Sequence, residues 1–320
     1  MITCTTPRGF VGFAPAKLNL FFEIHGKRPD GYHNVCSLCC QVSVFDTLVI
    51  SSIESPEIVF SCEYVNFTQT AKDIPTGAEN LVVKAVEHVR GRYNIQSGCR
   101  IRLIKRIPSQ AGMGGGSSDA AMAIRLACKM WNLRLTQDEM VVLGTELGSD
   151  VPLFFFDDLT LGRGRGELIE PVGLSPRMDF VIVKPPENIS TSDAYRACSA
   201  DHITDHRSPE QLLKGLRSGN RLEIRSGMFN RLETTARLLC PKIRQIREQF
   251  EKLDCPAHQM TGSGTTYFAL CRHRQHARQL AARLRLENIG EVFVAHSVTS
   301  AVLCGKTTTM EETNYGNHRC

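Results

Sequence analysis

The stretch AGMGGGSSDAAMAIRLACKMW (residues 111–131) decides how the rest of this chain is interpreted. Four glycines within positions 112–116 directly precede a segment whose apolar residues recur at helical spacing. Glycine in a helix interior costs about 1 kcal/mol relative to alanine, so this placement needs another explanation. The first N–H groups of a helix lack partners, and the helix dipole is positive there. Because glycines let the backbone approach a phosphate closely, the sequence predicts a polyphosphate site.

This glycine loop does not match two well-known phosphate-binding fingerprints. A Walker A loop would end in Gly-Lys-Ser/Thr, whereas Gly116 is followed by Ser117, Ser118 and Asp119. The dinucleotide pattern G-x-G-x-x-G cannot be laid on residues 112–117. A flexible turn without a ligand is the alternative. The two serine hydroxyls at the helix start favour the phosphate site, where they would orient phosphate oxygens or a magnesium ion.

The segments around the loop predict an α+β fold in two domains, because 320 residues exceed what one core usually serves. Prolines at 171 and 176 mark a candidate boundary, and we expect domains at 1–172 and 173–320. Alternating or continuous apolar runs predict strands over 14–26, 43–50, 99–109, 179–186, 265–271 and 291–298. The strand over 14–26 is expected to bury one face, and the apolar run after Asp150 predicts one more strand. Helical spacing predicts helices over 79–94, 118–131, 136–148, 208–217, 220–236, 241–253 and 274–286, followed by a frayed polar tail over 305–320.

The composition of the chain limits the classes of partner that we expect. The net charge is +5, with 38 basic and 33 acidic residues interspersed, which suits a phosphorylated small molecule better than nucleic acid. No run reaches the roughly 18 apolar residues of a membrane span. The 13 cysteines are odd in number and irregularly spaced, which indicates reduced thiols and a cytoplasmic protein. Cys36 and Cys39 form one C-x-x-C pair without the second pair of a zinc site.

Three segments, taken together, resemble the motifs of the GHMP small-molecule kinases. PSQAGMGGGSSDAA (108–121) resembles their phosphate-binding motif, and PAKLNL (15–20) and MTGSGTTYFAL (260–270) resemble the other two, in the same order. The combination with DGYH (30–33) and LGSDVPLFF (147–155) is typical of one branch, whose acceptor substrate contains cytidine. The resemblance runs from about residue 14 to about residue 300. It implies a two-domain GHMP kinase architecture with the active site in the cleft between the domains, using ATP and Mg²⁺.

The resemblance also implies two catalytic residues. Phosphoryl transfer needs alignment, charge neutralisation and a group that takes the proton of the nucleophile. Asp150 follows a helix end and precedes an apolar run, where partial burial would raise its pKa toward the range of a base. Lys17 would hold Asp150 ionised and offset charge on the attacking oxygen. Without the resemblance, a helix-terminal Asp and a surface Lys would be the ordinary interpretations.

Further residues are carried over as ligand contacts. Asn80 resembles a position on the adenine side of ATP, and it is also a good helix N-cap. Positions 109–111 depart from other family members, which can carry more glycines there. The resemblance therefore does not predict the detailed contacts of these positions with the nucleotide. The expected nucleotide contacts are Asn80, Pro108, Ser109, Gln110, Ala111, Gly112, Met113, Gly114, Gly115, Gly116, Ser117 and Ser118. The expected substrate contacts are Asn19, Tyr32, His33 and Thr191, with Tyr32 and His33 suited to cytosine by stacking and hydrogen bonding.

Two other functions remain open at this point. Another GHMP kinase, of the homoserine or mevalonate type, would have no use for a cytidine pocket. A catalytically silent nucleotide-binding protein would not need both Lys17 and Asp150, and their presence argues against it. The expected partners are therefore small molecules, with no nucleic acid or membrane, in a monomer or homodimer.

Overall fold

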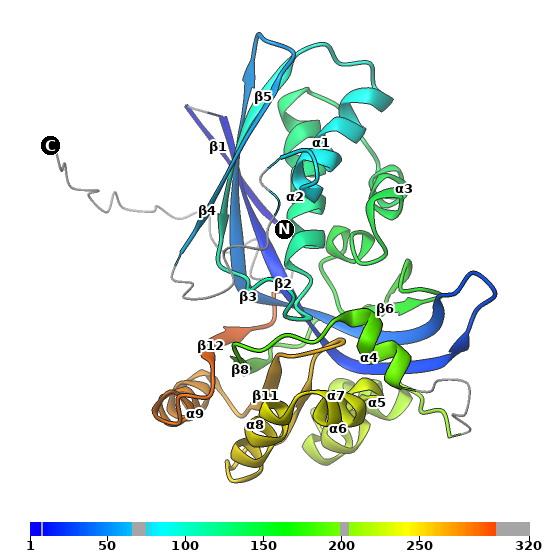
Figure 1. Ribbon diagram of the computed structural model, residues 1–320, viewed down its shortest axis with the longest axis vertical. Coiled ribbons are helices and arrows are strands. Elements are labelled where there is room, and N and C mark those ends of the chain that lie inside the picture. The colour runs from blue at the N-terminus through cyan, green and yellow to red at the C-terminus, as the bar shows by residue number, and fades with distance from the viewer. Residues whose placement is uncertain (8, 66–74, 76, 199–204, 299–320) are drawn as a thin grey trace, which may run out of the picture.

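The chain folds into two β-sheets with helices packed against them (Figure 1). The computed structural model describes residues 1–7, 9–65, 75, 77–198 and 205–298. The strands are β1 (Ile2–Thr6), β2 (Gly9–Lys27), β3 (His33–Ile53), β4 (Ile58–Tyr64), β5 (Gly98–Lys105), β6 (Thr160–Arg163), β7 (Leu168–Pro171), β8 (Asp179–Lys184), β9 (Phe229–Asn230), β10 (Ala257–Met260), β11 (Tyr267–Cys271) and β12 (Glu291–His296). The helices are α1 (Leu81–Arg92), α2 (Gly115–Met130), α3 (Gln137–Leu147), the 3-10 helix η2 (Pro152–Phe155), α4 (Thr191–Ala197), α5 (Glu210–Ser218), α6 (Arg221–Gly227), α7 (Leu232–Leu239), α8 (Pro241–Glu251) and α9 (Arg274–Leu286).

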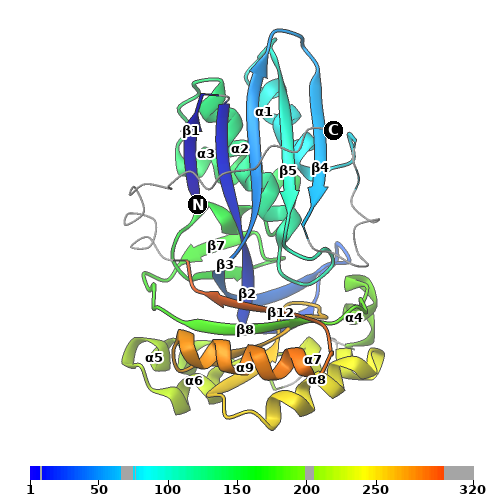
Figure 2. The ribbon, with the colours of Figure 1, turned by 90° about the vertical axis from the view of Figure 1, so that its left-hand side faces the viewer.

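The two sheets differ in size and in partners. The large sheet has the order β1-β2-β3-β5-β4, extended by β6 and β7 through β3 and by β9 through β2. The small sheet has the order β10-β11-β8-β12 and is antiparallel along β10-β11-β8 and β8-β12. Helices α1, α2 and α3 lie on one face of the large sheet, and α7, α8 and α9 lie beyond the small sheet (Figures 1 and 2). The predicted α+β fold is confirmed.

The core explains how the sheets are joined. One cluster packs α1, α2 and α3 on the large sheet, and a second packs α7, α8 and α9 on the small sheet. A third lies between the sheets and takes Phe180 and Ile182 from β8, whereas Val181 and Val183 face the second cluster. Strand β8 is therefore apolar on both faces, as its continuous hydrophobic run indicates.

The burial of strand β2 differs from the prediction. Residues 14–24 were expected to bury one face only, but every side chain in this stretch is buried. The reason is that β2 runs through all three core clusters, with Ala14 in the first, Leu18 in the third and Ile24 in the second. Lys17 and Asn19 thus lie inside the protein, where polar groups need partners.

Two further expectations were wrong. The apolar run after Asp150 forms the 3-10 helix η2 instead of a strand. Pro152 suits a first helical position, and Gly144 of α3 leaves room for the Phe155 ring, which would lie 2.8 Å from a Cβ there. The single helix expected over 220–236 is divided into α6 and α7 by β9, which pairs in parallel with β2.

The remaining helix predictions are confirmed, although α2 begins at Gly115, three residues before its expected start at 118. The Asn80 side chain accepts a hydrogen bond from the Val82 N–H and caps α1, and Thr136 with Glu139 forms the predicted capping box of α3. The domain boundary after residue 172 stays a prediction, and the expected tail over 305–320 lies outside the described residues.

Candidate active site

A cavity of about 510 Å³ lies where the two sheets meet. Its walls come from distant parts of the chain: β2, the glycine loop before α2, the turn after α3, the start of α4 and the turn between β10 and β11. The residues used below are Lys17, Asn19, Gly112, Gly114, Asp150, Arg165, Thr191, Tyr195, Gly262, Ser263 and Gly264. The structure therefore brings all three sequence motifs to one site.

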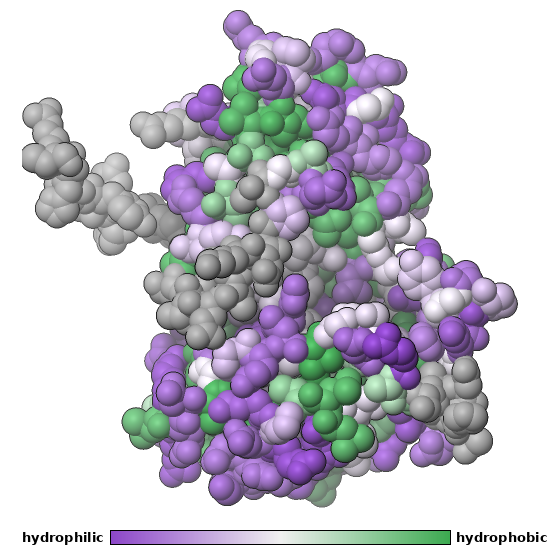
Figure 3. All heavy atoms as spheres, viewed as in Figure 1, coloured by the Kyte–Doolittle hydropathy of each residue, from purple (hydrophilic) through white to green (hydrophobic). Residues whose placement is uncertain are grey.

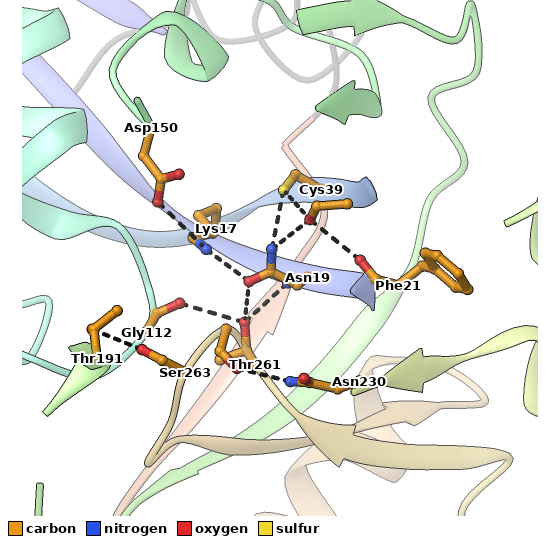
Figure 4. A network of polar contacts seen from close by, with 12 residues as sticks. Lys17, Asn19, Phe21, Cys39, Gly112, Asp150, Thr191, Asn230, Thr261 and Ser263 are labelled. Carbon is orange, nitrogen blue, oxygen red and sulfur yellow. Dashed lines mark hydrogen bonds and ion pairs between the residues drawn. The ribbon is translucent and has the colours of Figure 1, made fainter. Parts of the chain in front are cut away.

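Lys17 and Asp150 face each other in this cavity (Figure 4). The Lys17 Nζ lies 3.6 Å from Asp150 Oδ2 and donates a hydrogen bond of 2.7 Å to Asn19 Oδ1. The lysine side chain is only 6% exposed, whereas that of Asp150 is 47% exposed. Asp150 is thus open to the cavity, less enclosed than its apolar flank suggested.

The chain folds tightly around Asp150. Helix α3 ends at Leu147 with Gly148 as its C-cap, and the Gly148 carbonyl accepts a hydrogen bond of 3.1 Å from the Val151 N–H. Val151 and Pro152 are buried, so the turn is anchored on both sides of the carboxylate. This anchoring limits where Asp150 can reach.

Asn19 connects three segments of the site (Figure 4). Its amide donates to Ser37 Oγ at 2.7 Å on β3, and its main-chain N–H donates to Thr261 Oγ1 at 2.9 Å. The Thr261 hydroxyl donates in turn to Asn19 Oδ1 at 3.0 Å, and Gln259 Nε2 donates to the Asn19 carbonyl at 2.8 Å. A buried amide with this many partners fixes the position of Lys17. Its expected role as a substrate contact stays a prediction.

The glycine loop is shaped by left-handed backbone at two positions. Gly114 has φ 69° and forms the N-cap of α2, and Gly112 has φ 71°. A Cβ on Gly112 would lie 2.5 Å from the carbonyl oxygen of Thr261, so only glycine lets the loop approach that turn. The Met113 carbonyl accepts a 2.9 Å hydrogen bond from the Lys17 N–H, which ties the loop to β2.

A second cavity, of about 450 Å³, lies beside this loop. Of the expected nucleotide contacts, it is lined by Asn80, Pro108, Ser109, Gln110, Ala111, Gly112, Gly114, Gly115, Gly116 and Ser117. Met113 and Ser118 do not line it: both are buried, and Met113 packs in the cluster between the sheets. Their roles as nucleotide contacts stay predictions.

A buried charge network below the loop was missed at the sequence level. Lys105, the last residue of β5, donates to Asp46 Oδ2 and, at 2.7 Å, to Asp119 Oδ2. Burial acts to lower the pKa of Lys105, but the two carboxylates outweigh it and raise the pKa. Burial and Asp46 raise the pKa of Asp119. Asp119 Oδ1 has no protein partner, and Asp119 lines the cavity beside the loop.

Aromatic rings gather next to the central cavity. A neighbouring cavity of about 650 Å³ is lined by Tyr32, His33, Arg165, Thr191 and Tyr195, among others. The Tyr32 side is open, with the residue 55% exposed, and the Arg165 guanidinium lies 5.0 Å from its ring centre. The His33 and Tyr195 ring centres are 5.0 Å apart. Burial raises the pKa of Tyr195, so its phenol stays protonated.

Tyr195 and Arg165 were missed as site residues. Their signals were present, because Tyr195 closes the ISTSDAY segment and Arg165 lies in the GRGRG stretch, but nothing local showed where they point. Thr191 was predicted, and its hydroxyl lies 2.9 Å from Ser263 Oγ across the cavity. This contact joins the α4 segment to the third motif.

Comparisons with known proteins agree with this geometry. Residues 80–158 match the model of the GHMP kinases N terminal domain, and residues 212–289 match that of the GHMP kinases C terminal. The 4-diphosphocytidyl-2-C-methyl-D-erythritol kinase of Bacillus pumilus is 33% identical over 85% of this chain and 91% of the relative.

Solved structures give the same assignment. A crystal structure of 4-(cytidine 5'-diphospho)-2C-methyl-D-erythritol kinase superposes with a TM-score of 0.74 at 29% identity, covering 89% of this chain and 98% of the other. The L. major mevalonate kinase, at 16% identity and a TM-score of 0.70 over 91% and 96% of the two chains, shares the fold alone. The chain belongs to the GHMP kinase family, and within it to the 4-diphosphocytidyl-2-C-methyl-D-erythritol kinases.

Further observations on the described residues concern their thiols, metal ligands, helices and surface. Their cysteines are all free thiols, and they include no cluster of three or more His, Cys, Asp or Glu placed to hold a metal. Across the same residues, we find no helix with the length and apolar character needed to cross a bilayer. On the face shown in Figure 3, apolar residues lie in separate groups among hydrophilic ones.

Proposed function

We propose that this chain transfers the γ-phosphoryl group of ATP to the 2-hydroxyl of 4-diphosphocytidyl-2-C-methyl-D-erythritol. The observation that carries the proposal is the Lys17–Asp150 pair, 3.6 Å apart, in the central cavity, which shares lining residues with both the glycine-loop cavity and the aromatic cavity. A phosphate donor on one side and a nucleobase-containing acceptor on the other would meet at this pair. The related kinases of this name supply the acceptor for the proposal.

In the proposed reaction, the acceptor hydroxyl oxygen forms a bond to the γ-phosphorus while the bond to the β,γ-bridging oxygen breaks and ADP leaves. Asp150 takes the hydroxyl proton, for which its half-exposed carboxylate is available. Lys17 places a positive charge next to the oxygen on which negative charge develops. Asn19 keeps the ammonium in that position through its 2.7 Å hydrogen bond.

The acceptor would extend from Asp150 into the aromatic cavity. Tyr32, His33 and Tyr195 offer ring faces and an imidazole for cytosine. Arg165 lines this cavity and the central one, so its guanidinium is placed to attract the diphosphate between base and alcohol. A homoserine or mevalonate substrate would leave these groups unused.

The residues beside the glycine loop fit a nucleotide and its metal ion. Left-handed glycines and the start of α2 suit phosphates, and Asn80 lines the same cavity. Ser117 and Asp119 supply oxygen ligands at the cavity wall, which Mg²⁺ prefers. When bound, Mg²⁺ would neutralise charge on the donor phosphates.

The proposal is tested by ADP release from the purified protein with magnesium-ATP and 4-diphosphocytidyl-2-C-methyl-D-erythritol, with homoserine and mevalonate in parallel. We expect turnover with the cytidyl substrate only, and a new phosphomonoester signal in the phosphorus NMR spectrum. Turnover with another substrate would keep the family and refute the assigned acceptor. ATP binding without any turnover would favour a silent nucleotide-binding protein.

The role of Asp150 is tested by Asp150→Asn. Loss of the base should lower kcat roughly 10²- to 10⁴-fold and leave the Kd for ATP nearly unchanged. Asp254→Asn is the matched control, because Asp254 is an exposed acid paired with Arg272 away from the cavity. Near-normal turnover of Asp150→Asn would show that the base is misassigned.

A further inference from the structure

Lys184, the last residue of β8, is a buried cation that the reaction itself does not use. Its side chain is inside the protein, with the residue 4% exposed. The ammonium donates to the Pro185 carbonyl, to the Glu187 carbonyl at 3.0 Å and to Asn188 Oδ1 at 2.9 Å. All three N–H groups of the ammonium therefore donate to one short loop, residues 185–188, and hold it at the end of the strand.

This loop leads directly to the acceptor side of the site. Ile189, Ser190 and Thr191 follow it and line the central cavity, and α4 then presents Tyr195 to both cavities. The Glu187 carbonyl, which Lys184 holds, also accepts a 2.7 Å hydrogen bond from Thr265 Oγ1 beside the third motif. The position of the loop thus sets the position of Thr191 and Tyr195.

We propose that Lys184 is a positioning residue for the acceptor substrate: its ammonium holds residues 185–188 so that Thr191 and Tyr195 face the cavity, and loss of its proton weakens acceptor binding. This inference rests on the proposed function. It does not extend to ATP, because the nucleotide cavity is lined by residues of the large-sheet half of the chain, between 75 and 119.

The charges around Lys184 place its titration in an accessible pH range. Burial lowers the pKa of Lys184 to about 8, against the opposing effects of Glu187 in its own loop, Cys240 at the start of α8 and Glu291 on β12. Glu291 is the direct strand partner of Lys184, and burial raises its pKa to about 6. As the pH rises through 8, Lys184 therefore loses its charge, whereas Glu291 is already ionised. The neutral amine keeps two N–H donors, so one of the three loop contacts is lost.

The experiment measures the KM for the cytidyl acceptor and for ATP between pH 7 and 9.5 in the full chain. Wild type is compared with Lys184→Met, which keeps an unbranched side chain one atom shorter and removes the charge and the donors. Lys252→Met, at an exposed lysine just after α8, is the matched control. We expect Lys184→Met to raise the acceptor KM about tenfold, as for loss of hydrogen bonds to a charged group, with the ATP KM within about twofold.

The pH profile separates positioning from simple destabilisation. In wild type and Lys252→Met, the ratio of acceptor KM to ATP KM should rise above pH 8, and in Lys184→Met it should stay flat. Equal changes in both KM values, or a wild-type ratio that is flat to pH 9.5, would overturn the inference. If Lys184→Met does not fold, the wild-type ratio alone decides. If wild type does not turn over the cytidyl acceptor at all, the proposed function fails instead.

Discussion

Gly112→Ala tests whether the approach of the glycine loop to the third motif is required for catalysis. At φ 71°, an alanine costs about 1–2 kcal/mol of backbone strain. Its Cβ would also lie 2.5 Å from the Thr261 carbonyl oxygen, roughly 1 Å inside the start of ordinary contact at 3.4 Å. Because both atoms are anchored to backbone, the loop or the turn must shift by about that amount. A displacement of about 1 Å near reacting groups can cost on the order of 10²-fold in rate.

Gly219→Ala is the matched control for backbone strain. Gly219 has φ 69°, caps the end of α5, and a Cβ there meets nothing within 4 Å. Urea unfolding should show a loss of about 1–2 kcal/mol in the control and at least that in Gly112→Ala. Steady-state kinetics should show a kcat/KM about 10²-fold lower in Gly112→Ala and nearly unchanged in Gly219→Ala. If the two variants keep similar kcat/KM, the contact between loop and turn does not matter for catalysis.

Three further outcomes are expected. Lys105→Met leaves two buried carboxylates without their cation and should lower the free energy of unfolding by about 3–5 kcal/mol in urea; a loss below about 1 kcal/mol would contradict this. Burial acts to raise the pKa of Glu23, but hydrogen bonds from Arg231 and two main-chain N–H groups hold it below 4.5. The stability from this ionised pair is present above pH 4.5 and is lost as the pH falls below it. The Tm of wild type should therefore fall more than the Tm of Glu23→Gln as the pH is lowered below 4.5, and parallel Tm curves would refute this. Tyr195→Ala should raise the acceptor KM about tenfold through lost stacking and leave the ATP KM unchanged, and an unchanged acceptor KM would remove Tyr195 from the base site.

Local pattern was sufficient where the physics is local. The glycine cluster before an amphipathic segment predicted α2 to within three residues of its start, because the polar start of a helix and the freedom of glycine are properties of adjacent residues. The two-residue spacing of Lys17 and Asn19 is likewise a local property that puts both on one side of β2, where a hydrogen bond joins them.

Pattern failed where the packing partner comes from elsewhere in the chain. The sequence of β2 cannot show that a second sheet covers its other face, since that sheet begins more than 150 residues later at β8. For the same reason, the approach of Tyr195 to His33 was not predictable. The partners of Lys105 could not be identified either, because Asp46 comes from a different strand.

The geometry of Lys17 connects this packing to the chemistry. A buried ammonium is costly unless hydrogen-bonded, and Asn19 meets that need at 2.7 Å. The distance to Asp150 is 3.6 Å, longer than the roughly 2.8 Å of a tight charge-assisted hydrogen bond. The lysine is therefore held in place chiefly by the Asn19 amide. Asp150 is near enough to interact with the charge of Lys17 without forming a tight hydrogen bond to it. A base that must accept a proton from a substrate hydroxyl needs an oxygen that is not already committed. Holding the cation through Asn19, itself fixed by Ser37 and Thr261, leaves the carboxylate available for that step.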